Sequence, residues 1–291
     1  MNIDFEQLVL EKNNMSLEEF ESYSPFEMNL LLYHTFTDKR SPLTLHTISD
    51  QDKKEIPFFQ FIKYLLNILK EEKEIKLTKI GNFPPKYVKE LYEQKFILQE
   101  DIESGITKLT NQQDYYFFEM AVIICHLLKW IKKRNNCMSL TKKGEKILKH
   151  EDNMLKDLFI LFFSKFNWGY FDGYDDEPEI QNTSVFFLIC LSKYGQTERP
   201  ISFYTDKIFG AFPHLSDKPF PDFIPTFKIY YSKLYNIRFF RLFLKTMGLI
   251  YYRRERDREF FSEKIFIKKT PVFDKLLGII PHVDYSQINI S

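Results

Sequence analysis

Two stretches of the chain decide the fold, Lys129-Trp-Ile-Lys-Lys-Arg-Asn-Asn-Cys-Met-Ser-Leu-Thr-Lys-Lys-Gly-Glu-Lys-Ile-Leu148 and Gly248-Leu-Ile-Tyr-Tyr-Arg-Arg-Glu-Arg-Asp-Arg-Glu-Phe-Phe-Ser-Glu-Lys-Ile-Phe-Ile-Lys-Lys-Thr-Pro-Val-Phe-Asp-Lys-Leu-Leu277. Each predicts the end of a helix, two strands joined by a polar turn, and a further helix that begins at a threonine. The hydroxyl groups of Thr141 and Thr270 can cap those helices, and Pro271 takes the first helical position, where a missing amide hydrogen costs little. The two stretches therefore predict a repeated hairpin followed by a helix.

The residues before the first stretch extend this pattern to a whole unit. From Pro57 to His150 the predicted order is helix, strand, helix, helix, two-stranded wing and helix, which is the order of a winged-helix domain. Leu127-Leu128-Lys129, before the first hairpin, corresponds in kind to Phe243-Leu244-Lys245, before the second. The sequence therefore predicts two tandem winged-helix-like units.

The chain of 291 residues is long enough for two compact domains. We expect a mainly α fold with small β-hairpins, because only 9 glycines and 13 prolines interrupt it. The predicted layout is an N-terminal helical arm over residues 1–50, a first winged-helix-like domain over 51–167, an acidic and aromatic linker over 168–182, and a second winged-helix-like domain over 183–291.

Charge is segregated along the chain, although the whole molecule carries a formal net charge of only +1. Residues 1–30 hold seven acidic side chains against a single lysine, a net charge of −6. Residues 129–149 hold eight basic side chains against one glutamate, a net charge of +7. An acidic arm repels a phosphate backbone, so we expect it to pack on the basic body or to meet another protein chain, whereas the basic stretch suits phosphate.

The leading functional hypothesis is a DNA-binding, regulatory protein whose partner is double-stranded DNA. The helix just before the first wing, Phe117–Leu128, is almost entirely apolar and should be buried, so base reading falls to the helix Pro85–Gln94. The second wing alternates bases with acids that can pair them. The expected contact residues come from that helix, the first wing, the helix after it and the second wing: Lys86, Lys89, Lys132, Lys133, Arg134, Lys142, Lys143, Arg253, Arg254 and Arg256, with Arg258 a further wing cation.

A non-enzymatic protein-interaction module built on the same domains is the alternative, and either the acidic arm or the loop Trp168–Tyr174 would be its contact. No catalytic, nucleotide-binding or zinc-ligand motif is present, so we expect no enzyme activity, cofactor or metal. The acidic loop Asp172–Glu179 reads as a solvated linker, with binding of a hard cation as the other reading. Three scattered cysteines and the lack of a long apolar stretch predict a cytoplasmic protein without a membrane partner.

The segment Ser139-Leu-Thr-Lys-Lys-Gly-Glu-Lys-Ile-Leu148 resembles the residues after the wing in MarR-like and PadR-like transcriptional regulators, where a strand end of the form Leu-Thr-x-x-Gly opens the next helix. The chain as a whole resembles an uncharacterised family of bacterial proteins through Leu77–Lys86, Phe166–Tyr174 and Thr270–Leu277. The first resemblance implies a winged-helix unit, and the second implies a shared fold alone.

Overall fold

The computed structural model describes residues 5–257 and 262–283. Within these residues the chain is mainly helical and carries small antiparallel sheets, as the sequence predicts. It forms two compact units. Unit 1 takes in the described residues of Met1–His46, Tyr174–Lys245 and Leu249–Ser291, and unit 2 consists of Thr47–Gly173 with Thr246–Gly248. We describe each unit by itself.

Unit 2 packs its helices around a small sheet with the strand order β2-β4-β3. Its core is anchored by helix α4, whose phenylalanine and leucine side chains, spaced three and four residues apart, are fully buried, among them Phe58, Phe61 and Leu65. The helices and strands of unit 2 are α3 (Asp50–Lys54), α4 (Pro57–Glu72), β2 (Ile75–Lys76), α5 (Pro85–Glu93), α6 (Glu100–Glu103), η2 (Gln112–Asp114), α7 (Tyr116–Leu127), β3 (Ile131–Arg134), β4 (Cys137–Leu140), α8 (Lys142–Ile147), α9 (Glu151–Ser164) and η3 (Trp168–Phe171).

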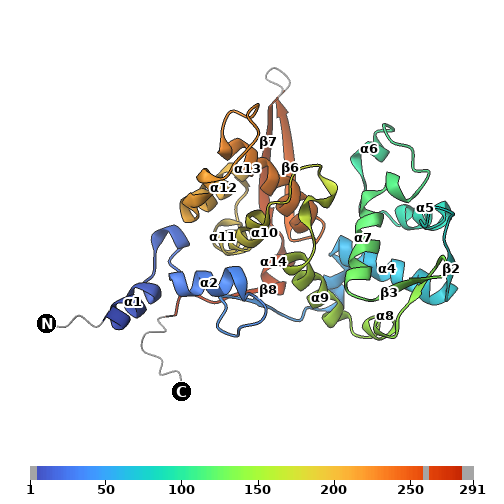
Figure 1. Cartoon of the computed structure of the whole chain (residues 1–291), viewed down its shortest axis with the longest axis horizontal. Coiled ribbons are helices and arrows are strands. Elements are labelled where there is room, and N and C mark those ends of the chain that lie inside the picture. The colour runs from blue at the N-terminus through green and yellow to red at the C-terminus, as the bar shows by residue number, and fades with distance from the viewer. Residues whose placement is uncertain (1–4, 258–261, 284–291) are drawn as a thin grey trace. The chain divides into compact units, whose positions relative to one another are not determined.

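Unit 1 has a longer hairpin, β6–β7 (Figure 1). Its sheet repeats the scheme of unit 2, with the strand order β5-β7-β6. A second small sheet pairs β1 with β8, which lie far apart in the sequence. The elements of unit 1 are α1 (Phe5–Asn14), η1 (Glu18–Phe20), α2 (Pro25–Tyr33), β1 (Leu43–Leu45), α10 (Pro178–Ser184), α11 (Phe186–Tyr194), β5 (Arg199–Pro200), α12 (Ile201–Ala211), η4 (Pro213–Asp217), α13 (Phe227–Tyr235), the π-helix η5 (Asn236–Lys245), β6 (Ile250–Asp257), β7 (Ser262–Lys269), α14 (Pro271–Leu276) and β8 (Leu277–Ile279).

The bases of the two hairpins have the same backbone geometry. The amide of Thr141 donates to the carbonyl of Trp130, and the amide of Thr270 donates to that of Leu249, both at 2.9 Å. Each hairpin is entered through a residue with a left-handed backbone, Lys129 (φ 59°) in one and Gly248 (φ 66°) in the other.

This geometry corrects the sequence alignment. Lys129 corresponds to Gly248, so Leu127–Lys129 corresponds to Thr246–Gly248 and not to Phe243–Lys245. The shift arises because similarity of residue type cannot distinguish neighbouring turns of an apolar helix.

The N-terminal segment contains the helices α1 and α2 but does not form the separate arm over residues 1–50 that the sequence predicts. Residues up to His46 cluster with unit 1, because their polar and backbone groups bond there. The buried carboxylate of Glu21 accepts hydrogen bonds from Lys193 at 2.7 Å and from the Tyr194 hydroxyl at 2.6 Å, and it also pairs with Lys207. The sequence leads to two expectations for this acidic segment, packing on basic side chains of the same chain or contact with another protein chain. At Glu21 the structure shows the first.

The predicted linker over residues 168–182 differs from the structure in its second half. Helix α10 begins at Pro178, which occupies a first-turn position, and its Ile180 side chain is completely buried in unit 1. Trp168 is also buried, and its indole N–H donates to the carbonyl of Phe162 at 2.7 Å in unit 2. Aromatic and apolar side chains within this acidic stretch therefore give it packed structure that its charge does not predict.

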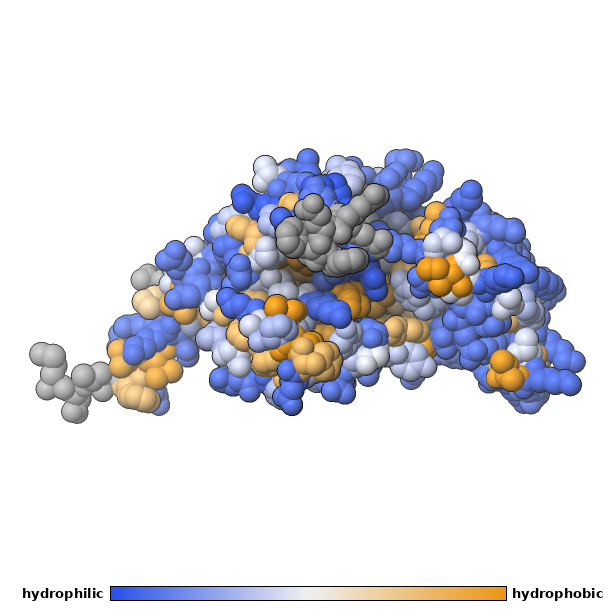
Figure 2. All heavy atoms as spheres, turned by 90° about the horizontal axis from the view of Figure 1, so that it is seen from above, coloured by the Kyte–Doolittle hydropathy of each residue, from blue (hydrophilic) through white to orange (hydrophobic). Residues whose placement is uncertain are grey.

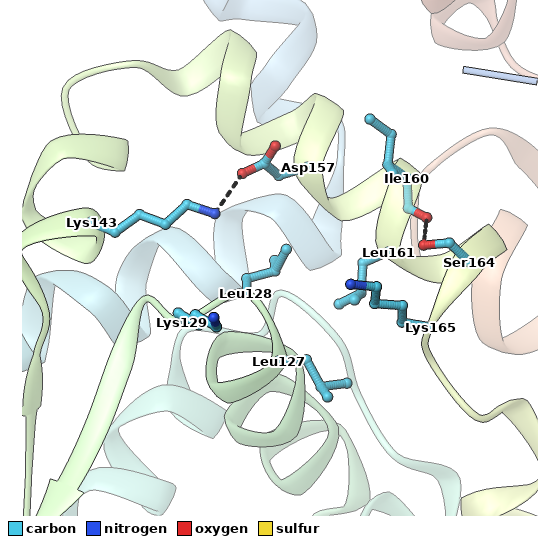
Figure 3. A pocket seen from close by; sticks show the side chains of 9 residues that line it. All are labelled: Leu127, Leu128, Lys129, Lys143, Asp157, Ile160, Leu161, Ser164 and Lys165. Carbon is cyan, nitrogen blue, oxygen red and sulfur yellow. Dashed lines mark hydrogen bonds and ion pairs between the residues drawn. The ribbon is translucent and has the colours of Figure 1, made fainter. Parts of the chain in front are cut away.

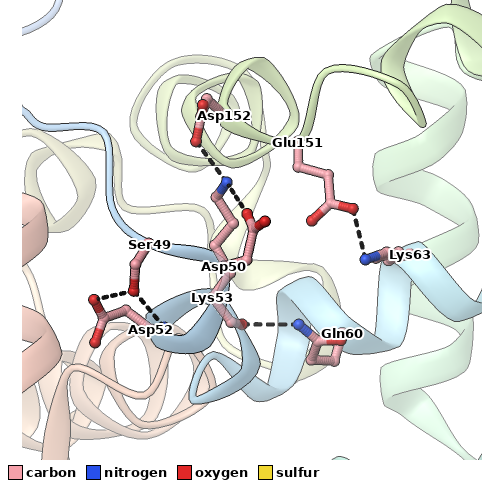
Figure 4. Close-up of polar contacts among 8 residues, drawn as sticks. All are labelled: Ser49, Asp50, Asp52, Lys53, Gln60, Lys63, Glu151 and Asp152. Atoms are coloured by element: carbon pink, nitrogen blue, oxygen red, sulfur yellow. Dashed lines mark hydrogen bonds and ion pairs between the residues drawn. The ribbon is translucent and has the colours of Figure 1, made fainter.

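A buried lysine joins two helices of unit 2 (Figure 4). The ammonium of Lys53 on α3 contacts the carboxylates of Asp50 at 3.0 Å and of Asp152 on α9 at 2.8 Å. Nearby, Lys63 on α4 pairs with Glu151 at 2.6 Å. Because burial of an unpaired ammonium is unfavourable, these carboxylates are what allow Lys53 to lie beneath the surface.

Candidate nucleic-acid interface

The first hairpin, β3–β4, is closed by a tight turn that is fixed to the loop after β2. Asn135 and Asn136 both have left-handed backbones, with φ of 50° and 57°, which asparagine tolerates better than most residues. The amide nitrogen of the Asn136 side chain donates to the carbonyls of Leu77 and Thr78, each at 3.1 Å. The polar tip of the hairpin is therefore held in place by side-chain hydrogen bonds.

The strand register places cations on the outer face of this sheet. Arg134 and Lys76 both lie opposite Cys137, and Lys132 lies opposite Ser139. Directly opposed residues point to the same side of a sheet, and the alternate residues Ile131 and Met138 are buried. We call Lys76, Lys132 and Arg134 the outer hairpin face.

Lys133 points the other way and reaches the loop between β2 and α5. Its Nζ atom lies where a side chain on Gly81 would begin, 2.4 Å from the Cβ position, so this glycine leaves room for the ammonium. Gly81 also has φ of 88°, a conformation that other residues adopt with strain. Partial burial and the charge of Lys133 lower the pKa of His126, which keeps that imidazole neutral at neutral pH.

Within the described part of the chain, Lys132, Lys133 and Arg134 have no carboxylate partner. Glu74 lies beside the outer hairpin face, and its hydrogen bond with Cys137 raises the pKa of that thiol. Three exposed, uncompensated cations on one short strand give this hairpin a positive field suited to phosphate groups.

The other expected contacts in unit 2 are exposed but differ in their environment. Lys86 lies over the ring of Tyr87, 4.3 Å from its centroid, and Lys89 is exposed on the same helix, α5. On α8, Lys142 is exposed, whereas Lys143 pairs with Asp157 at 3.6 Å. Helix α7, which precedes the hairpin, is largely buried as predicted, with Phe118 and other side chains completely covered.

In the second hairpin, β6–β7, carboxylates pair with Arg253 and Arg254. Arg253 donates to Glu198 through Nε at 3.0 Å and through Nη2 at 2.5 Å, and it also pairs with Glu255. Arg254 pairs with Glu263 at 3.6 Å. The backbone of Arg256 is described in β6 but its side chain is not, and Arg258 lies outside the described residues. The expected contacts at Arg253 and Arg254 are thus already occupied by intramolecular ion pairs.

Sequence reasoning missed a second pair of cations, Arg241 and Lys245, on the π-helix that precedes this hairpin. Both are exposed, and neither has a carboxylate partner within residues 5–257 and 262–283. Lys245 lies 5.5 Å from the ring centroid of Tyr252; partial burial, followed by repulsion from Arg241, lowers its pKa. The sequence does carry a signal for this pair: the two cations are four residues apart and flank apolar positions, a spacing that makes them neighbours on a helix surface.

The acidic loop Asp172–Glu179 is engaged by cations of unit 1. Glu179 pairs with Lys218 at 2.7 Å and with His214 at 3.0 Å, and the buried Arg238 donates to the carbonyl of Asp175 at 2.8 Å. Burial raises the pKa of Glu177. No group of three or more metal-binding side chains gathers here or elsewhere among the described residues.

Comparisons with protein-family models, with curated proteins and with solved structures find no match for this chain. None of the helices formed by residues 5–257 and 262–283 combines the length and the apolar character needed to cross a membrane.

Proposed function

We propose that this protein binds double-stranded DNA as a regulator, through two winged-helix-like units of which the first hairpin is the principal phosphate contact. The observation that carries the proposal is the set of uncompensated cations Lys132, Lys133 and Arg134 on a hairpin whose tip is fixed by Asn136. Cations held on an ordered hairpin contact phosphates without the entropic cost of ordering a mobile loop.

The fold supports the winged-helix part of this proposal. In both units a short strand pairs with the last strand of the hairpin, in the orders β2-β4-β3 and β5-β7-β6. A helix precedes that short strand and two or more helices separate it from the hairpin, as in a winged helix.

The two units would contact the duplex differently. Because α7 is buried, unit 2 offers hairpin contacts that position the protein on phosphates and carry little sequence information. In unit 1, Arg241 and Lys245 lie on the helix before the hairpin, the element that reads base edges in helix-turn-helix proteins. Base reading would therefore be shared between this helix of unit 1 and α5 of unit 2, which exposes Lys86 and Lys89.

The test is a titration of random-sequence duplex DNA by the intact chain at several salt concentrations, followed by fluorescence anisotropy. Each neutralised phosphate contributes about −0.9 to the slope of log K against log salt, so three hairpin cations alone predict a slope near or below about −2.7. A protein that does not bind duplex DNA even at low salt would overturn the proposal.

A second candidate function, a protein-interaction module, is favoured by helix α1. Phe5, Val9 and Leu10 are 73%, 41% and 52% exposed, and Figure 2 shows hydrophobic surface, in orange, at the left of the view, where α1 lies in Figure 1. Such side chains on a solvent-facing helix suit a partner surface. Absence of DNA binding, together with loss of a protein complex on changing Phe5 and Leu10 to serine, would favour this candidate.

A further inference from the structure

A pocket of about 300 Å³ lies in unit 2, between the end of α7, the start of α8 and the second half of α9 (Figure 3). Its apolar surface comes from Leu127, Leu128, Ile160 and Leu161. Leu127 is 44% exposed, so an apolar side chain faces the opening. The volume is at the lower limit of the about 300–1,000 Å³ that small-molecule sites occupy. The pocket can therefore hold a small molecule with an apolar portion.

Lysines surround this apolar surface. Lys129, Lys143 and Lys165 all line the pocket, and Figure 3 shows the first and last on opposite sides of Leu128. Asp157 pairs with Lys143, at 3.6 Å, whereas Lys129 and Lys165 have no carboxylate partner within the described residues. The formal charge of the lining is +2, from three lysines and one aspartate.

Two helix ends reduce this positive charge without cancelling it. Helices α7 and α9 both end at the pocket, and each carries about half a negative charge at its C-terminus. Lys165 directly follows the last residue of α9, and Lys129 lies one residue beyond the C-cap of α7, so both cations interact favourably with the negative ends of these helices. About one positive charge remains over an apolar surface, and this combination matches a ligand with a single anionic group.

We propose that this pocket binds a small amphiphilic anion, a molecule with one carboxylate and an aliphatic or aromatic body of about eight carbons. The carboxylate lies between Lys129 and Lys165, and the carbon chain covers Leu127, Leu128 and Leu161. The site is separate from the outer hairpin face and does not depend on DNA binding.

The pocket lies beside the base of the first hairpin, because Lys129 belongs to both. Lys129 immediately precedes that hairpin, and its carbonyl accepts a hydrogen bond from the Thr141 hydroxyl at 2.6 Å. The same hydroxyl accepts from the amide of Gly144 at 3.0 Å and so caps α8, which carries Lys143. A ligand whose carboxylate lies beside Lys129 thus contacts the residue that enters the hairpin, and the Thr141 hydroxyl joins that residue to the start of α8.

The experiment measures binding of octanoate to the intact chain by isothermal titration calorimetry, with octan-1-ol and hexanoate as comparison probes. Octanoate should bind at least about tenfold more tightly than octan-1-ol, because its carboxylate forms charge-assisted hydrogen bonds. It should bind about tenfold more tightly than hexanoate, since two further methylene groups are buried.

Substitutions of the lining lysines test whether octanoate binds in this pocket. Lys129→Gln and Lys165→Gln should each weaken octanoate binding about tenfold. Lys156→Gln is the matched control: it removes an exposed lysine of α9 that does not line the pocket, and should change binding less than about twofold.

Thermal unfolding of each variant verifies that the chain is folded. Equal affinity for octan-1-ol and octanoate, octanoate binding that survives both glutamine substitutions, or the absence of any octanoate binding would each overturn the proposal.

Discussion

The two units share a backbone scheme but place their uncompensated cations on different elements. In unit 2 the hairpin carries Lys132, Lys133 and Arg134 without carboxylate partners, and the helix before it is buried. In unit 1 the hairpin residues Arg253 and Arg254 are paired with glutamates, whereas the helix before the hairpin exposes Arg241 and Lys245. The difference teaches that the fold alone does not locate a binding surface; the balance of neighbouring charges does.

The largest effect on DNA binding is expected from removing the cations of the first hairpin, and it should be much larger than the effect of the same change in the second. Changing Lys132, Lys133 and Arg134 together to glutamine should weaken duplex binding about 500-fold at 0.1 M salt and reduce the salt slope by about 2.7, if each contacts one phosphate. The matched control, Arg253→Gln with Arg254→Gln, should change affinity less than about twofold, because those side chains are already paired. Similar losses in both variants, measured by anisotropy, would remove the distinction between the hairpins.

The two units also differ in how closely a glycine is packed. A Cβ atom on Gly144 would lie 2.0 Å from the carbonyl oxygen of Trp130, whereas one on Gly210 in α12 would meet nothing within 4 Å. Gly144→Ala should therefore lower the free energy of unfolding by about 3 kcal/mol, through overpacking against backbone. Gly210→Ala should be neutral or stabilising by up to about 1 kcal/mol. Urea unfolding of both variants is the measurement, and a tolerated Gly144→Ala would show that the hairpin base can relax.

The cations of unit 1 give the next effect in size. Arg241→Gln combined with Lys245→Gln should weaken DNA binding about 60-fold at 0.1 M salt if each residue contacts one phosphate. Lys228→Gln with Lys233→Gln, on the preceding helix α13, is the control for removal of two charges from the same unit. If Arg241 and Lys245 read bases, the loss will depend on the DNA sequence; a uniform loss would assign them to the phosphate backbone.

Local rules predicted the features that depend on a few neighbouring residues. The caps at Thr141 and Thr270 form as expected, with their hydroxyls accepting from the amides of Gly144 and Phe273. These features are encoded within one or two turns of chain.

Features that depend on distant pairing were not predictable. Strand β1 pairs with β8, and Arg253 meets Glu198, 55 residues away in the sequence. Lys76 joins the outer hairpin face because β2 pairs with β4, which the hairpin sequence does not reveal. The sequence therefore predicts the unbalanced charge of the first hairpin, where charges are local, but not the pairing of Arg253 and Arg254, where tertiary ion pairs decide which cations are available.

A smaller effect is expected from the buried acid of unit 1, Glu21, whose counterpart in unit 2 is the buried Lys53. Burial alone would raise the pKa of Glu21, but hydrogen bonds from Lys193, Lys207 and Tyr194 lower it below its ordinary value of 4.5. The stabilisation is complete above that value and is lost as the pH falls through the lowered pKa. Glu21→Gln should cost about 2 kcal/mol at pH 7. Urea unfolding should show this difference shrinking in acid, and a cost that does not depend on pH would contradict the assignment.

The smallest effect is expected from giving the second hairpin a cation without a carboxylate partner, as the first hairpin has. Glu198→Gln combined with Glu255→Gln removes both carboxylates that pair with Arg253, while Phe266 still supports the guanidinium at 4.5 Å. The freed cation should strengthen DNA binding about twofold to eightfold at 0.1 M salt and steepen the salt slope by up to about 0.9. Exposed ion pairs contribute little to stability, so the free energy of unfolding should change by less than about 1 kcal/mol. An unchanged salt slope would mean that the second hairpin does not reach DNA even when its charge is available.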